Sequence, residues 1–119
     1  MKRRCLLTAL AGLLPFKAFA HVRRAVLHRF TATAYALRGI SASGKPARTG
    51  MVAADPRVLP LGSRIRIHNL GRYSGEYLVG DTGGMIKGNR IDIFVESYDE
   101  AVQFGRQRVH VEILASPAS

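Results

Sequence analysis

Short segments of alternating apolar and polar residues dominate this sequence, and they constrain its fold more than any other feature. In residues 29–37, the apolar residues Phe30, Ala32 and Ala34 alternate with Thr31, Thr33 and Tyr35, which is the period-two pattern of a half-buried strand. Further strands are expected at 51–55, 63–70, 76–81, 89–95 and 107–114. The connections leave no room for crossover helices, so the pattern predicts a small all-β barrel of six strands.

The alternation also assigns the two faces of each predicted strand. In residues 89–95, Ile91 and Ile93 are predicted to face inward, which places Asp92 and Phe94 on the outer face. In the last strand the predicted inward residues are Val109, Val111 and Ile113.

One short helix is expected between the last two strands. Ser97 and Glu100 have the spacing of a capping box, in which a side-chain oxygen accepts a hydrogen bond from a backbone N–H of the first turn. Gly105 is a residue of the type that ends helices. Residues 40–50, which include Gly, Ser and Pro, are predicted as a loop.

The first 20 residues have the organisation of a secretory signal peptide. Lys2, Arg3 and Arg4 precede a short apolar run, and residues 18–20 read Ala-Phe-Ala, an A-x-A cleavage signal. The apolar run is too short to span a bilayer. We therefore expect export to the periplasm or cell envelope, no stable membrane span, and a single domain over residues 21–119.

Composition narrows the chemistry of the exported domain. The only cysteine, Cys5, precedes the expected cleavage site, so neither a disulfide nor a cofactor is predicted, and the scattered histidines do not predict a metal site. The formal charge is +10 for the full sequence and +6 once Lys2, Arg3, Arg4 and Lys17 are removed, and this excess of positive charge favours an anionic partner. No aromatic and basic recognition motif indicates nucleic acid, so an anionic polymer of the cell envelope fits better. The alternative is that the charge serves solubility alone.

Residues 80–94, GDTGGMIKGNRIDIF, hold two of the four aspartates. Asp81 ends one predicted strand, and Asp92 lies on the outer face of the next. The glycine-rich connection would bring the two carboxylates towards each other, and burial or a neighbouring carboxylate raises a carboxyl pKa, as a general acid requires. The alternative is structural: Asp81 caps a turn, and Asp92 pairs with Arg90 or Lys87.

Three motifs, TATAY, AADPRVLPLGSRI and GDTGGMIKGNRIDIF, occur in this order along the chain. Together they resemble the 3D domain, a family named for three aspartates, which are here Asp55, Asp81 and Asp92. The resemblance extends from Thr31 to Ile113. It implies a six-stranded double-psi β-barrel related to the catalytic barrel of membrane-bound lytic transglycosylase A.

This resemblance implies an enzyme that cleaves peptidoglycan glycan strands between N-acetylmuramic acid and N-acetylglucosamine without water, leaving 1,6-anhydro ends. It assigns Asp92 as the catalytic acid and base, and Asp81 as the partner that tunes it and helps to orient substrate. Asp55 is expected to hold the cleft or to bind sugar. The resemblance also places the following residues along the substrate groove: Thr33, Tyr35, Thr49, Gly50, Thr82, Gly83, Lys87 and Gly88.

The transglycosylase A relatives carry a second domain that helps to wall the groove, and the single predicted domain lacks one. A homodimer could then complete the groove. The main alternative function is a non-catalytic barrel that binds cell-wall glycan. A hydrolase of another glucan that uses Asp81 and Asp92 is a further alternative. An aspartic protease, which the Asp-Thr-Gly sequence suggests, is disfavoured because too little chain follows the motif.

Overall fold

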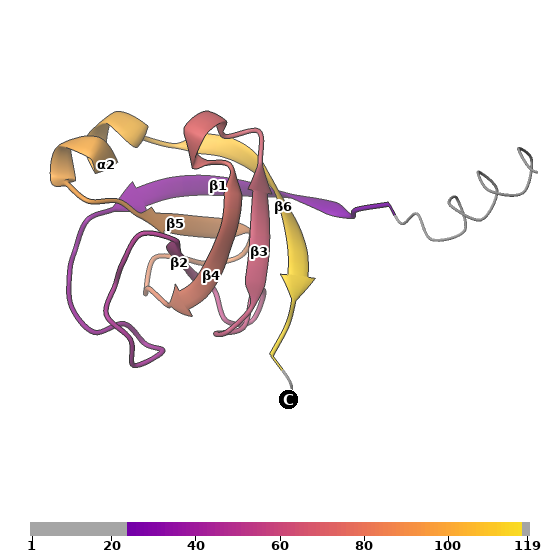
Figure 1. The fold of residues 1–119 in the computed structure, drawn as a ribbon, viewed down its shortest axis with the longest axis horizontal. Coiled ribbons are helices and arrows are strands. Elements are labelled where there is room, and N and C mark those ends of the chain that lie inside the picture. The colour runs from indigo at the N-terminus through magenta and orange to yellow at the C-terminus, as the bar shows by residue number, and fades with distance from the viewer. Residues whose placement is uncertain (1–23, 118–119) are drawn as a thin grey trace, which may run out of the picture.

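The computed structural model describes residues 24–117, and the predicted signal peptide lies outside them. Its strands are β1 (Leu27–Tyr35), β2 (Met51–Ala54), β3 (Arg64–His68), β4 (Gly75–Asp81), β5 (Arg90–Phe94) and β6 (Gln107–Ala115). A short 3-10 helix, η1 (Gly71–Tyr73), connects β3 to β4, and the helix α2 (Tyr98–Phe104) connects β5 to β6 (Figure 1). Among these residues, no helix is long and apolar enough to cross a membrane.

The six strands close into a barrel in the order β1-β5-β2-β4-β3-β6. Two neighbouring pairs are parallel, β1 with β5 and β2 with β4. The other four pairs are antiparallel. Closure removes the free sheet edges that would otherwise pair with other chains. The prediction of a mostly β fold with six strands and one short helix is confirmed, and its double-psi form stays a prediction.

Aliphatic side chains from every strand fill the barrel, as the alternation predicts. The buried cluster includes Phe30, Ala32, Val52, Ala54, Ile65, Ile67, Val79, Ile91, Ile93, Val109 and Val111. Ile113 pairs with the buried Ile65 and so keeps the predicted inward register, but its side chain is 42% exposed. It lies beyond Glu112, the last residue of β6 that pairs with β1, so it is less covered than Val109 and Val111.

The outer face of β2 and β5 is covered rather than exposed. Met51, Ala53 and Phe94 are buried, although they do not belong to the cluster inside the barrel. Phe94 lies on the outer face as predicted but is only 2% exposed, because the ring of Tyr35 packs edge-to-face against it at 5.6 Å and the Arg38 guanidinium lies 5.6 Å from its centroid.

The connection from β1 to β2, residues 36–50, is attached to the end of β4. The N–H of Ser43 donates to the carbonyl of Gly80 at 3.1 Å, and the N–H of Ala42 donates to the Asp81 carboxylate at 2.9 Å. The predicted loop is therefore confirmed as a loop. It is also held against the part of the barrel that carries Asp81.

The capping signals of the predicted helix are confirmed in α2. The Ser97 hydroxyl accepts a hydrogen bond from the Glu100 N–H at 3.1 Å, and Gly105 ends the helix with a φ of 65°. Phe104 is buried and packs edge-to-face on Tyr73 with 5.0 Å between ring centroids. This contact fixes α2 against η1, at the end of the barrel shown at the top of Figure 1.

Candidate functional site

Two of the three motif aspartates lie in one row across the outside of the barrel. Ala53 of β2 pairs with Asp92 of β5 on one side and with Asp81 of β4 on the other. Thr33 of β1 pairs with Asp92 from the far side of β5. We call these four residues, Thr33, Asp92, Ala53 and Asp81, the aspartate row. Since neighbouring strands lie about 4.8 Å apart, the two aspartate Cα atoms are about 10 Å apart.

Asp92 is half-buried and is held by a single side-chain hydrogen bond. The Thr33 hydroxyl donates to Asp92 Oδ1 at 2.9 Å. Burial raises the pKa of Asp92 above its ordinary value, although the Thr33 hydrogen bond and the positive charge of Arg90 act in the opposite direction. Among the described residues, no ion pair involves Asp92, so the structural alternative of a surface pair with Arg90 or Lys87 is not observed.

The Asp81 carboxylate is held by backbone donors. Its Oδ1 accepts hydrogen bonds from the N–H groups of Ala42, at 2.9 Å, and Thr82, at 2.8 Å. Asp81 therefore does stabilise a turn, as the structural alternative proposed, and it also anchors the loop 36–50. These contacts fix the position of a carboxylate on the opposite side of Ala53 from Asp92.

Tyr35 adds a hydroxyl to the aspartate row. This hydroxyl is buried and has no hydrogen-bond partner among residues 24–117. Burial, followed by the charges of Asp81 and Asp92, raises the pKa of Tyr35 to about 12. The phenol thus stays protonated, and it is a hydrogen-bond donor close enough to both carboxylates to respond to their charge.

Asp55 is set apart from the aspartate row and is 2% exposed. Its carboxylate accepts hydrogen bonds from the Arg57 backbone and side chain and from the N–H of Gly88 at 2.9 Å. The Arg57 side chain, and then the backbone donors of Gly88 and Arg57, hold the pKa of Asp55 well below its usual range. Of its two predicted roles, this geometry suits holding the cleft, because Asp55 ties the end of β2 to the loop that enters β5.

The other predicted groove residues fall into two groups around the aspartate row. Thr49 and Gly50 lie just before β2, where the Thr49 hydroxyl donates to Glu96 Oε2 at 2.6 Å. Thr82, Gly83, Lys87 and Gly88 belong to the connection between β4 and β5. In that connection, a Cβ on Gly83 would lie 2.9 Å from Ile86, so the close packing of the turn requires glycine.

Sequence reasoning missed three residues of this region. Ala53 separates the two carboxylates and leaves space between them, but an alanine inside a short apolar strand carries no signal of its own. Glu96 accepts hydrogen bonds from both Thr49 and Arg38. Arg38 also lies over Phe94. Only the strand register reveals that these residues meet. No group of three or more His, Cys, Asp or Glu side chains within residues 24–117 could hold a metal ion.

The sequence matches the 3D domain family over residues 50–115. This match covers more than half of the chain and includes all three aspartates, so the protein belongs to the 3D domain family.

Curated relatives of this chain are found in Bacillus subtilis (strain 168). The cell wall-binding protein YocH is 40% identical over 93 residues, which are 71% of this chain and 31% of YocH. YabE, whose name refers to cell wall shaping, is 34% identical over 89 residues, which are 71% of this chain and 21% of YabE. The chain thus spans less than a third of the length of either relative.

Solved structures of lytic transglycosylases share the fold. MltA from E. coli with bound chitohexaose has a TM-score of 0.57 and 22% identity, over 69% of this chain and 29% of that chain. MltA from Neisseria gonorrhoeae has a TM-score of 0.50 and 24% identity, over 67% of this chain and 24% of that chain. At these identities the likeness shows that this chain has an MltA-like fold.

Proposed function

We propose that this protein is an exported peptidoglycan lytic transglycosylase with Asp92 as its single general acid and base. It would cleave the bond between N-acetylmuramic acid and N-acetylglucosamine and leave 1,6-anhydro ends. The single observation that carries the proposal is the state of Asp92: a half-buried carboxyl with a raised pKa, in no described ion pair, on the outside of an MltA-like fold. A raised pKa is the change that a carboxyl needs in order to act as a general acid.

The proposed reaction needs one acid and no water. Protonated Asp92 gives its proton to the glycosidic oxygen while the bond from that oxygen to C1 of the muramic acid breaks, and positive charge develops on that sugar ring. The Asp92 carboxylate then accepts the proton of the C6 hydroxyl of the same sugar as its oxygen bonds to C1. The anhydro ring is closed, and Asp92 is again protonated. Retaining and inverting hydrolysis instead require two carboxyl groups and a water molecule.

Asp81, Tyr35 and Asp55 would each support this reaction in a different way. Asp81, held by two N–H donors, would supply fixed negative charge opposite the developing positive charge. The Tyr35 hydroxyl, which lacks a partner among the described residues, would donate to a sugar oxygen once substrate displaces what covers it. Asp55 would keep the connection between β4 and β5 in place rather than touch substrate.

Substrate would contact Thr33, Thr49, Gly50, Thr82, Gly83, Lys87 and Gly88, and the ring of strands would have the double-psi connectivity. A second copy of the chain would help to wall the groove. Light scattering of the exported form, with and without glycan strands, tests the homodimer.

A second candidate function is a cell-wall glycan-binding module without catalysis. The relationship to YocH, a cell wall-binding protein, favours it. Digestion of purified peptidoglycan with mass spectrometry of the products separates the candidates. Anhydro-muramoyl ends support the transglycosylase, and reducing ends that take oxygen from isotopically labelled water indicate a hydrolase. Binding to peptidoglycan without any cleavage indicates the binding module.

A further inference from the structure

A basic cavity opens on the outer surface where β1 meets β6. It has a volume of about 610 Å³, and its polar lining includes Arg29, Arg108, His110 and Asn89. Arg29 pairs directly with His110 across the two strands. Both arginine side chains are exposed at this cavity, so the barrel presents two guanidinium groups to solvent from adjacent strands.

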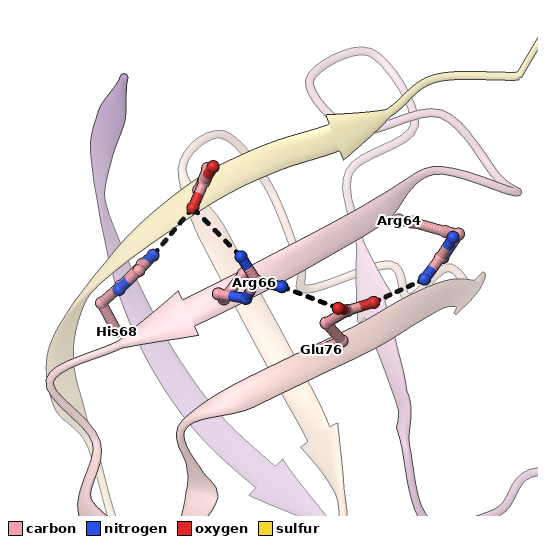
Figure 2. A network of polar contacts seen from close by, with 5 residues as sticks. Arg64, Arg66, His68 and Glu76 are labelled. Atoms are coloured by element: carbon pink, nitrogen blue, oxygen red, sulfur yellow. Dashed lines mark hydrogen bonds and ion pairs between the residues drawn. The ribbon is translucent and has the colours of Figure 1, made fainter. Parts of the chain in front are cut away.

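These arginines differ from those on the neighbouring face of the barrel. Figure 2 shows Arg64 and Arg66 linked to Glu76, and Arg66 and His68 also contact Glu112, so that this face is close to electrically balanced. In contrast, no ion pair within residues 24–117 includes Arg29 or Arg108. All four glutamates of the sequence pair with other basic residues, so none of them balances the charge of Arg29 or Arg108.

His110 adds an imidazole to the cavity. The side-chain amide of Asn69 contacts His110 Nδ1 at 3.1 Å, which leaves Nε2 as the ring nitrogen that can donate to a ligand. Two guanidinium groups and one imidazole N–H around one opening form a set of donors suited to a carboxylate or phosphate.

The cavity continues from the aspartate row along the same face of β1. Thr31 lines the cavity, and Thr33, two residues further on, holds Asp92. Residues two apart on a strand point to the same face and are separated by about 6.6 Å. A polymer bound over Asp92 would therefore place a group attached to its adjacent unit at the cavity.

We propose that the cavity around Arg29, Arg108 and His110 binds a carboxylate of the peptide stem of peptidoglycan. This inference rests on the proposed function, since the glycan strand bearing that stem is the one positioned at Asp92. The arginines would favour strands that still carry their peptides over bare glycan. The cavity would thus determine which part of the cell wall the site engages.

Binding is tested with the double variant Arg29→Gln/Arg108→Gln. Its matched control, Arg24→Gln/Arg64→Gln, removes the same charge outside the cavity and leaves Glu76 paired with Arg66. Both are made with Asp92 intact and with Asp92→Asn, so that binding is measured without turnover and cleavage is measured in parallel. The probes are soluble glycan strands with stem peptides, the same strands after an amidase has removed the peptides, and a polyglycerol phosphate without sugar or peptide.

The expected result is roughly tenfold weaker binding of peptide-bearing strands by the Arg29/Arg108 variant, with little change for bare strands or for the control. The affinity of the parent protein for peptide-bearing strands should also fall with added salt more steeply than that of the variant. The proposal would be overturned if the Arg29/Arg108 variant lost affinity equally for both kinds of strand or lost none. An equal loss of affinity in the control variant would also overturn it. A parent protein that binds polyglycerol phosphate more tightly than peptide-bearing strands would also overturn it.

The outcomes separate this inference from the proposed function. Peptide-dependent binding without cleavage by any form would refute the transglycosylase and leave the stem-binding cavity standing. The parent protein could instead cleave both kinds of strand equally well while the Arg29/Arg108 variant binds them unchanged. That result would refute the stem-binding role of the cavity alone.

Discussion

Replacing Thr33 with valine should make Asp92 a weaker acid. The Thr33 hydroxyl donates to Asp92 Oδ1 at 2.9 Å, and this bond favours the ionised carboxylate and so lowers its pKa. A hydrogen bond to a charged group contributes about 1.5–3 kcal/mol, and the lower end applies here because Asp92 is only half-buried. Since about 1.4 kcal/mol is a factor of ten, the acid dissociation constant of Asp92 should fall roughly tenfold. Valine keeps the shape of threonine and suits a strand.

The assay is the release of soluble muropeptides as a function of pH. Asp92 must be protonated to start the reaction, so activity declines as the pH rises through its pKa. In Thr33→Val this alkaline limb should move to higher pH. Thr31→Val makes the same change two residues earlier, where no hydrogen bond reaches Asp92, and should leave the position of the limb unchanged. A limb that stays in place or moves to lower pH in Thr33→Val would refute the assignment of Asp92 as the titrating acid.

Three further variants test the supporting structure. Asp55→Asn should lower the free energy of unfolding in urea at neutral pH. The loss should shrink below about pH 4, because the depressed pKa of Asp55 stabilises the fold only while the carboxyl is ionised in the unfolded chain. A loss of stability that does not depend on pH would contradict this. Tyr35→Phe removes a buried hydroxyl that has no partner among the described residues, so the free energy of unfolding should stay equal or rise by up to about 1 kcal/mol. Cleavage of peptidoglycan should fall. Unchanged cleavage would exclude a contact between this hydroxyl and substrate. Gly80→Ala places a Cβ within 2.9 Å of Met51 and should lower the free energy of unfolding by about 1–3 kcal/mol. Adding Met51→Ala should relieve part of this loss in a double-mutant cycle. Additive losses of stability would contradict the clash.

Much of the fold could be predicted because local patterns determine it. Alternation, short apolar runs and turn residues located the six strands, and Ser97 and Gly105 marked the ends of α2. Local patterns failed where tertiary contacts decide the outcome. Phe94 has the position of an exposed outer residue, but Tyr35 and Arg38 cover it. Ile113 continues the alternation opposite the buried Ile65, but it lies beyond the last pair of β6 with β1, and its side chain is 42% exposed.

The candidate site was predicted in its residue types more fully than in its arrangement. The sequence pointed to Asp81 and Asp92, but their common neighbour Ala53 depends on one strand pairing with two others. The burial of Asp55 depends on Gly88, which is 33 residues away in the chain. The predicted rise in the pKa of Asp92 could come from burial or from a second carboxylate, and burial is the largest cause in the folded chain.

The most direct test of the central claim compares Asp92→Asn with Asp99→Asn in the digestion of purified peptidoglycan. Both changes remove one carboxylate of the same size, but Asp99 lies exposed in the first turn of α2. Circular dichroism and urea unfolding establish that both variants are folded. We predict anhydro-muramoyl ends from the parent and from Asp99→Asn, and none from folded Asp92→Asn. Anhydro ends from Asp92→Asn at the parental rate would contradict the assignment of Asp92 as the catalytic acid and base.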